Sequence, residues 1–395
     1  MRKRASRAKP DRSQIGPPQG KPTQPRPGTG AESTARRPPR RLFSLDAFRG
    51  LAVLAMLLVN DKALGPATPH QLRHARWAGH VHFADMVWPW FLLIVGVAIA
   101  YSAASQGARS QRRRSYVLRV VKRAAILVAL GCVISSSYAR RPVLGMGVLQ
   151  IIGLAYLVAA LLYGLTAKQR LMVAAALLAG HWAAIRFIPV PGAEAGVFTE
   201  SHNLAAYLDQ AYFQRFGLEG LLSIVPTSAL VLVGTAIGDL LRREAYSSNA
   251  RAELLAAGGL GLLMMGWLWH FDLPFNKPLW TASFVVWAAG WGALVLALFY
   301  WLIDIRGWRA WAMPLSIAGM NAVFAYVVPI LVKLHTLRNW AWPGAESLTL
   351  ERGLQQFVFA HLGPVPGGLA YTSGYILFWW LILLWMYRRR IFLRV

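Results

Sequence analysis

The chain has few of the features on which soluble proteins and many enzymes depend. Its 395 residues include one cysteine, Cys132, so disulfides within the chain and cysteine-based metal sites are excluded. Only 15% of the residues are charged, and acidic residues are scarce, with 16 Asp and Glu against 42 Lys and Arg. The sequence also lacks a P-loop, a GxGxxG turn after a strand and an HExxH motif. Nucleotide hydrolysis, dinucleotide binding and zinc proteolysis therefore have no support in the sequence.

Hydrophobic residues are abundant instead. They make up 56% of the chain, which includes 17 Trp, and the mean hydropathy is +0.41. A soluble domain of this size could not bury so much apolar surface, whereas apolar runs of about 18–22 residues match the roughly 30 Å hydrocarbon core of a bilayer. We therefore predict an all-α, polytopic membrane helix bundle of about ten transmembrane helices. The expected spans are 45–60, 83–102, 117–136, 147–165, 170–187, 220–241, 253–269, 281–303, 312–332 and 371–387.

Residues 1–41 differ from the rest of the chain. They are rich in Arg, Lys, Pro, Gly and Gln and contain almost no large apolar residues, so we expect a disordered basic cytoplasmic tail. No apolar h-region follows the basic start, which argues against a cleaved signal peptide. A net charge of +26 would suggest nucleic acid in a soluble protein, but here we expect the tail to contact anionic membrane lipid and no nucleic acid to bind. Residues 42–395 are expected to form the transmembrane domain.

The basic residues predict the orientation of the protein in the membrane. Outside the tail they concentrate in alternate loops, at 103–123, 166–171, 242–251, 304–309 and in the terminal RRRIFLRV. Because an excess of Lys and Arg marks the cytoplasmic side, we predict that both termini are cytoplasmic. The loop 61–82 then faces the periplasm or the exterior. We expect an integral protein of a bacterial inner membrane.

Ionisable residues gather in and beside the outer loop 61–82. Membrane proteins rarely place such residues at helix ends unless they pair, bind or react. An imidazole can accept a proton near neutral pH or attack an acyl carbon, an Asn amide can donate to an oxyanion, and a carboxylate can hold the second ring nitrogen. We therefore expect His74 to face a watery cavity and to act on a proton or an acyl group. Asn60 and Asp85 are its predicted catalytic partners.

The other histidines of this loop are rival candidates for the reacting group. They are His70, His80 and His82, and any histidine of the loop can instead be a hydrated surface residue. The HxH spacing of residues 80 and 82 has no matching carboxylates, so we predict no metal site.

A second group of residues is predicted to contact an anionic cofactor. Arg49 follows an acidic residue by three positions, so it can pair on one helix face or meet a ligand that enters from the cytoplasm. Lys122 and Arg123 either flank a span or contact the phosphates of a nucleotide-like ligand. Asn276 lies in the outer segment HFDLPFNKPLWTAS. Asn321 lies within a span, where a buried amide fastens helices together or lines the reaction cavity.

Several segments resemble those of one known family. The chain contains, in that family's order, SLDAFRGLAVLAMLLVN, HARWAG, DMVWPWFLLIVGVAIAYS, GVLQIIGLAYLVAALL, EGLLSIVPTSALVLVGTAIGDLL, FNKPLW, GMNAVFAYV and YRRRIFLRV. They resemble the heparan-alpha-glucosaminide N-acetyltransferase family from about residue 41 to the end. The resemblance implies a membrane enzyme that carries an acetyl group from cytoplasmic acetyl-CoA to an amino sugar on the far side. It also implies that His74 is the active histidine and that Asn60 and Arg123 fall on family site residues.

The chain departs from the family pattern at two places. The family's WNG reads Trp77, Ala78 and Gly79 here, so an amide is missing beside the site. The family's RIPGVLQR reads LGMGVLQI, without the arginines and the proline. These changes bear on the acceptor and on some cofactor contacts, and we expect the donor chemistry to be kept.

The combined prediction is a transmembrane acyltransferase. It moves an acetyl or short acyl group from cytoplasmic acyl-CoA to an amino sugar or glycan outside, with His74 as general base or transient acyl carrier and acetyl-CoA as co-substrate. The nucleotide end of the donor is expected near Arg49, Lys122 and Arg123, and a homodimer is left open. Two alternatives are a transporter or flippase for a glycolipid or small anion, and a non-catalytic membrane scaffold.

Overall fold

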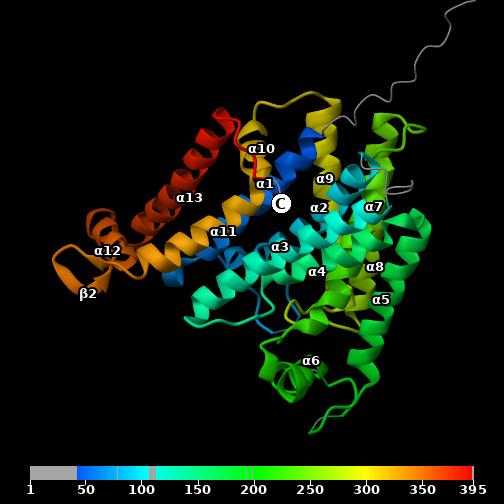
Figure 1. Ribbon diagram of the computed structural model, residues 1–395, viewed down its shortest axis with the longest axis horizontal. Helices are drawn as coiled ribbons and strands as arrows, with labels where there is room; N and C mark the ends of the chain where they lie inside the picture. Colours follow the sequence, from blue (N-terminus) through cyan, green and yellow to red (C-terminus); the bar gives the residue numbers. More distant parts are fainter. Residues whose placement is uncertain (1–41, 78, 106–112, 193, 198, 394–395) are drawn as a thin grey trace, which may run out of the picture. The chain divides into compact units, whose positions relative to one another are not determined.

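The computed structural model describes residues 42–395 except 78, 106–112, 193, 198 and 394–395. The tail 1–41, predicted to be disordered, lies outside the described residues. Within the described part, the regular structure comprises 13 α-helices, several short 3-10 and π turns, and one two-stranded hairpin (Figure 1). The all-α prediction is confirmed.

All ten expected spans coincide with helices. The long helices are α1 (Phe43–Asp61), α2 (Phe83–Ser105), α3 (Arg113–Ala139), α5 (Ala167–Phe187), α7 (Ile224–Leu241), α8 (Ser248–His270), α9 (Ala282–Phe299) and α13 (Pro364–Arg388), and the shorter ones are α4 (Val148–Leu161), α10 (Met313–Met320) and α11 (Ala322–Val332). Among the described residues, seven helices are long and apolar enough to cross a membrane, or eight if the bent pair α10–α11 counts as one. The predicted number of ten is therefore approximate, because α4 is short and α3 begins with a strongly basic segment.

Small residues allow the core helices to approach closely. α2 packs along α7, α8 along α9, and α1 along α10. Gly96 of α2 and Gly234 of α7 lie at one such contact, where a Cβ on Gly96 would overlap the carbonyl oxygen of Val231 and a Cβ on Gly234 that of Leu93. Helices in lipid associate through close van der Waals packing, which these glycines permit. The packing holds α1 and α2 firmly, and these helices carry the loop that contains His74.

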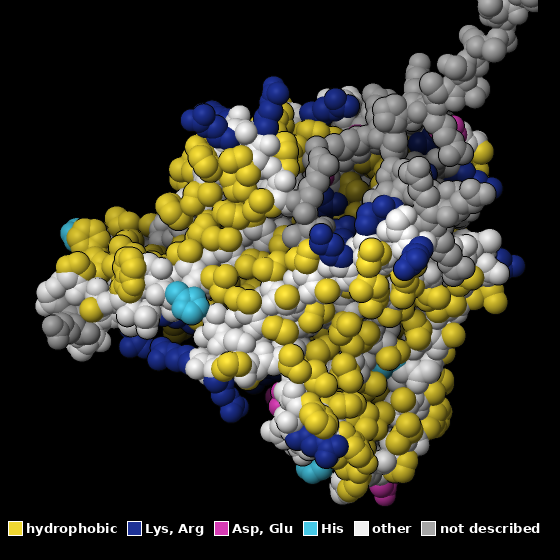
Figure 2. Space-filling model, in the orientation of Figure 1, with side chains coloured by type: hydrophobic (Ala, Val, Ile, Leu, Met, Phe, Trp, Pro, Cys, Tyr) yellow, Lys and Arg dark blue, Asp and Glu magenta, His cyan; other side chains and the backbone are white. Residues whose placement is uncertain are grey.

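Large apolar side chains remain exposed on the outer helices. On α8 they include Leu260, Met264, Trp267 and Leu268. Figure 2 shows hydrophobic side chains over much of the face in view. A soluble protein rarely exposes apolar patches of this extent, whereas helices that contact lipid do. The surface therefore agrees with an integral membrane protein.

The span expected at 312–332 is not one straight helix. α10 and α11 meet at Asn321 with a bend of 74°. The Asn321 amide is buried, donates to the carbonyl oxygen of Ile391 at 3.0 Å and accepts from the backbone N–H of Leu393 at 2.9 Å. Non-helical backbone at membrane depth needs such internal partners. The C-terminal segment thus closes the break in the helix.

Several elements were not expected from the sequence. They are α6 (Leu204–Leu208) with the turns η4 (Asp209–Phe213), η5 (Gln214–Phe216) and η6 (Leu221–Ser223), the turn η8 (Lys333–Leu337), the antiparallel pair β1 (Ala341–Trp342) and β2 (Ala345–Thr349), and α12 (Leu350–Leu362). An ion-pair chain ties the last group to the end of α1. Lys333 Nζ lies 2.6 Å from Asp61 Oδ1 and 3.3 Å from Glu351 Oε1, and Arg338 Nε lies 2.7 Å from Glu351 Oε2.

Candidate active site

The loop between α1 and α2 is held in place by its own polar groups and by the loop that precedes α9. It contains two short 3-10 turns, η1 (Gly65–Ala67) and η2 (His70–Leu72). His82 donates from Nδ1 to the carbonyl oxygen of Arg73 at 2.9 Å. Asn276 donates to the carbonyl oxygen of Trp77 at 2.5 Å, and Gly79 donates from its backbone N–H to the carbonyl oxygen of Phe275 at 3.1 Å. The position of His74 therefore depends on both loops.

Asp85, in the first turn of α2, is the centre of this arrangement. Its side chain is only 2% exposed. Oδ2 accepts from the backbone N–H of Ala75 at 3.0 Å and of His82 at 3.1 Å. Oδ1 lies 2.9 Å from Nδ1 of His74 and 3.2 Å from Nζ of Lys277. A carboxylate at a helix N-terminus with several donors is strongly stabilised in its charged form, so Asp85 can orient the imidazole.

Lys277 completes a triangle with His74 and Asp85. Its Nζ lies 3.1 Å from Nδ1 of His74. Burial lowers the pKa of the Lys277 ammonium below its ordinary value, and the nearby Asp85 carboxylate opposes this shift. The chain turns sharply at Lys277, because the backbone N–H of Trp280 donates to the Lys277 carbonyl oxygen at 3.0 Å and Trp280 adopts a left-handed φ of 51°. Such a conformation is uncommon for a bulky residue and is maintained only where its surroundings enforce it.

Asn276 enforces that turn. Its Oδ1 accepts from the backbone N–H of Leu279 at 2.8 Å, and its own backbone N–H donates to Thr281 Oγ1 at 3.0 Å. Asn276 is 1% exposed, so these bonds are shielded from water. The residue predicted to contact a cofactor is thus engaged in fastening the two loops that build the site.

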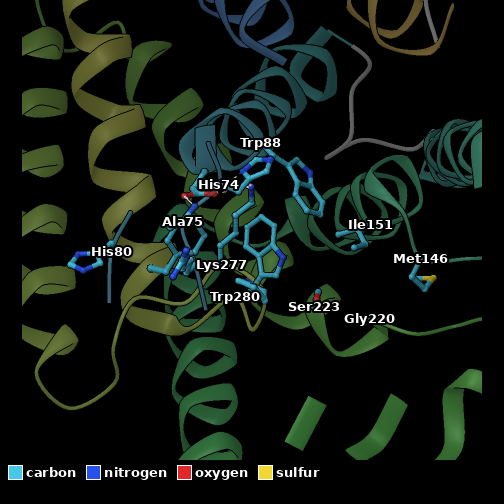
Figure 3. Close-up of a pocket in the computed structure, with 14 residues that line it drawn as sticks. His74, Ala75, His80, Trp88, Met146, Ile151, Gly220, Ser223, Lys277 and Trp280 are labelled. Carbon is cyan, nitrogen blue, oxygen red and sulfur yellow. Dashed lines mark hydrogen bonds and ion pairs between the residues drawn. The ribbon is translucent and has the colours of Figure 1, made fainter. Parts of the chain in front are cut away.

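A cavity of about 370 Å³ lies beside this triangle (Figure 3). His74 is half exposed, and no hydrogen bond connects its Nε2 to another described residue. The walls combine aromatic rings with a few polar groups. They are formed by residues that include Arg76, His80, Trp88, Ser223, Trp280 and Phe284. The indole N–H of Trp88 is buried and has no partner among the described residues. The cavity can hold a small polar molecule against the imidazole.

The other predicted site residues do not line this cavity. Asn60 is exposed near the C-terminal end of α1. Arg49 lies eleven residues earlier on the same helix, about 16 Å along its axis, and pairs with Asp46 at 3.2 Å. Lys122 is exposed on α3, and Asn321 lies at the break between α10 and α11.

Arg123 has a distinct environment on α3. Its guanidinium lies over the ring of Tyr156 in α4, 4.8 Å from the ring centroid. Its Nε is buried and has no hydrogen-bond partner within the described part of the chain. A guanidinium N–H that has no protein partner can donate to an anionic oxygen that reaches it. Among the described residues, no group of three or more His, Cys, Asp or Glu side chains is arranged to hold a metal ion.

Lys277 and Trp280 were not among the predicted site residues. The sequence contained one indication that Lys277 has a special role. Lysines are scarce in the loops predicted to face outward, and Lys277 lies in one of them, in FNKPLW. Nothing in the sequence indicated that this segment contacts HARWAG, which lies about 200 positions earlier. The backbone conformation of Trp280 has no local signal, since left-handed residues are usually Gly or Asn.

Comparisons with known proteins bear on the helices and loop that form this site. A family model described as heparan-alpha-glucosaminide N-acetyltransferase, catalytic, matches residues 41–270. The human heparan-alpha-glucosaminide N-acetyltransferase is 26% identical over 358 residues, which cover 73% of this chain and 52% of the human protein. The mouse protein of the same name is 25% identical over 366 residues, covering 74% of this chain and 54% of its own length.

The chain therefore spans about half the length of the curated relatives it matches. The family match is broader than any one motif, because it extends over α1, the His74 loop and the helices up to α8. It covers more than half of this chain and includes both residues of the His74–Asp85 contact. On this basis the chain belongs to the heparan-alpha-glucosaminide N-acetyltransferase family.

Proposed function

We propose that the protein is a transmembrane acyltransferase that moves an acetyl or short acyl group from cytoplasmic acyl-CoA to an amino sugar or glycan outside. Family membership supports acyl transfer as the reaction class. The observation that carries the proposal is the position of His74, whose Nδ1 lies against Asp85 at the edge of a 370 Å³ cavity. An imidazole that is oriented through one nitrogen can use the other as a base or a nucleophile.

Two routes use this imidazole. In direct transfer, the acceptor amine attacks the thioester carbon, its proton passes to Nε2 of His74, the carbon–nitrogen bond forms and the carbon–sulfur bond breaks. The CoA thiolate then takes up the proton. In the covalent route, Nε2 attacks the thioester carbon, the carbon–sulfur bond breaks and the thiolate leaves. The amine then attacks the acyl carbon, the bond from that carbon to Nε2 breaks, and the proton lost by the amine passes through Nε2 to the thiolate. Both routes need an unprotonated Nε2, which is obtained when Nδ1 carries the ring proton and donates it to Asp85.

The donor is proposed to bind with its phosphates toward the cytoplasm. Arg49, Lys122 and Arg123 belong to that end of the helices, and the buried Nε of Arg123, which has no partner among the described residues, supports a phosphate contact there. Asn60 is proposed to donate to the developing oxyanion. Because Asn60 does not line the cavity, this role requires the loop that follows α1 to shift when the donor binds. Asn321 is proposed to support the donor site through the break it stabilises.

The distribution of basic residues also bears on which side of the membrane supplies each substrate. Both termini are proposed to be cytoplasmic, in a bacterial inner membrane, because the basic loops mark that side. His74 then belongs to the outer end of α2, and the acceptor reaches it without crossing the membrane. The acyl group, rather than the sugar, is the species that must be delivered from the inner side.

The test is acyl transfer in proteoliposomes. Labelled acetyl-CoA is supplied on one face and glucosamine on the other, and the product is counted for the wild type, His74→Ala and a control, His361→Ala, at an exposed position on α12. We expect His74→Ala to lose about 10²–10⁴-fold of the rate, the usual contribution of a general base, and the control to keep it. Undiminished transfer by His74→Ala would refute the assignment.

One observation favours a second candidate, a transporter. Broken helices often form substrate sites in transporters, and α10–α11 is bent by 74°. The backbone of Ile391 and Leu393 fills the break, and both ends of the Asn321 side-chain amide are bonded to it. The amide is therefore not available to a transported substrate in this structure. Flux of a glycolipid or small anion without acyl-CoA turnover in the same vesicles would support the transporter.

A further inference from the structure

Nδ1 of His74 has two partners of opposite character. Asp85 Oδ1 lies 2.9 Å away and Lys277 Nζ lies 3.1 Å away. A carboxylate only accepts hydrogen bonds, and an ammonium only donates them. Nδ1 can carry a proton and donate it to Asp85, or it can offer its lone pair to Lys277, but it cannot do both. The two contacts therefore correspond to two different proton arrangements of the ring.

The two arrangements differ in whether Nε2 carries the ring proton. A neutral imidazole carries one proton. When Nδ1 holds it, Nε2 offers a lone pair toward the cavity and can act as a base or nucleophile. When Nδ1 accepts from a charged Lys277, Nε2 carries the proton and can do neither. A charged Lys277 therefore favours the arrangement in which His74 cannot react, and a neutral Lys277 favours the other.

The surroundings of Lys277 make this charge adjustable. Its side chain is 20% exposed, and burial lowers its pKa while the Asp85 carboxylate opposes the shift. Arg76 and His80, both from the His74 loop, are the other charged or titratable side chains among the described residues that line the cavity. The lining residues from α4, from the segment before α7 and from α9 carry no charge. Lys277 can thus lose its proton at a pH where an ordinary lysine keeps it.

We infer that Lys277 is a positioning residue that selects which ring nitrogen of His74 carries the proton. This inference rests on the proposed function. During direct transfer, the acceptor's proton goes to Nε2, while the Nδ1 proton moves to the neutral amine of Lys277. The ring exchanges tautomers without becoming charged. Lys277 then returns its proton to Nδ1 as Nε2 gives its own to the departing thiolate, which restores the starting arrangement.

The contrast between two substitutions separates this role from a structural one. Lys277→Arg keeps a permanent charge beside Nδ1, and Lys277→Met removes it with a side chain of similar length. If Lys277 only formed an ion pair with Asp85, the arginine variant would be the more active of the two. The inference predicts the reverse order. Lys277→Met should transfer the acyl group about 10- to 100-fold faster than Lys277→Arg, which corresponds to the free energy of one charged hydrogen bond.

A second measurement does not depend on enzyme activity. Diethyl pyrocarbonate acylates an unprotonated imidazole nitrogen, and mass spectrometry reports its attachment to His74, with the exposed His361 as an internal reference. Between about pH 6 and 10, modification of His74 in the wild type should lag behind that in Lys277→Met and approach it only toward the alkaline end, because Lys277 is still losing its proton there. Lys277→Met should show no such late rise, and Lys277→Arg should suppress modification throughout. Lys168→Met, at an exposed position on α5, serves as the control.

The outcomes distinguish failure of the inference from failure of the proposed function. If the wild type transfers no acyl group, the proposed function fails, and the modification profiles still test the role of Lys277. If transfer occurs but Lys277→Arg is as fast as Lys277→Met and is modified equally well, the inference is wrong. If neither variant folds, the wild-type profile still provides a test, since modification of His74 that does not rise at the alkaline end, where Lys277 loses its proton, would also refute the inference.

Discussion

Replacing Asp85 tests the site at its most connected residue. Its carboxylate contacts two backbone N–H groups, the His74 ring and the Lys277 ammonium, and its side chain is 2% exposed. Asp85→Asn keeps the shape and one acceptor oxygen, which can still receive the N–H groups of Ala75 and His82. Its new NH₂ group faces Nδ1 and forces the proton onto Nε2. Asp85→Ala removes all four contacts.

The expected magnitudes follow from these contacts. Removing one member of a buried ion pair costs about 3–5 kcal/mol, and in Asp85→Asn this cost decreases as the pH rises, because Lys277 loses its charge. Asp85→Ala adds two unsatisfied backbone N–H groups at about 1–3 kcal/mol each. Transfer by Asp85→Asn should fall about 10²–10⁴-fold, because the ring is held in the wrong tautomer.

Thermal unfolding in detergent and transfer in proteoliposomes measure the two effects. We expect the stability order wild type, Asp85→Asn, Asp85→Ala, with transfer nearly absent in both variants. Asp85→Asn should keep its content of helix, so its loss of rate reports chemistry rather than unfolding. Asp85→Asn with full transfer, or Asp85→Ala as stable as Asp85→Asn, would show that the carboxylate does not hold the loop and the ring as described.

Three further predictions follow from other contacts. Gly96→Leu should lower the unfolding temperature sharply, because a side chain there overlaps the α7 backbone, whereas Gly258→Ala, in open space on α8, should not. Asn276→Ala leaves the Trp77 carbonyl without its donor and should cost about 1–3 kcal/mol of stability. If Asn276 serves to fasten the two loops, this variant should lower kcat and leave the KM for acyl-CoA unchanged. Burial raises the pKa of Asp209, so this group stabilises its loop in the protonated form. Limited proteolysis of the loop should therefore accelerate as the pH rises through the raised pKa of Asp209, and Asp209→Asn should remove this pH dependence.

The helices and the reacting loop could be predicted from the sequence because their signals are local. Apolar runs separated by basic or polar loops indicated every helix that could cross the membrane. The break at Asn321 could not be predicted, since its partners Ile391 and Leu393 lie 70 or more positions away. α12 was missed because an amphipathic helix that lies outside the spans has no long apolar run.

The site could be predicted only in part, for the same physical reason. His74 and Asp85 are eleven positions apart, and the start of a helix is a favourable place for a carboxylate. Lys277 comes from a segment 203 positions away, and only the folded chain brings its charge to the imidazole. Asn60 has the correct chemistry for an oxyanion donor, but its position at the end of α1 depends on how the next loop folds. Sequence spacing does not contain that information.

Two buried ion pairs lie at the ends of the helices that border the His74 loop, and their difference indicates where chemistry can occur. Asp61 pairs with Lys333, and Glu351 pairs with both Lys333 and Arg338, so two carboxylates are matched by two cations. Asp85 pairs with Lys277, but this pair shares an imidazole that opens onto a cavity. Burying charge in either place costs desolvation energy, and a pair that is merely structural can often be replaced by apolar residues without loss. The Asp85–Lys277 pair could not be replaced in this way, because apolar residues there would no longer set which nitrogen of the His74 ring carries the proton.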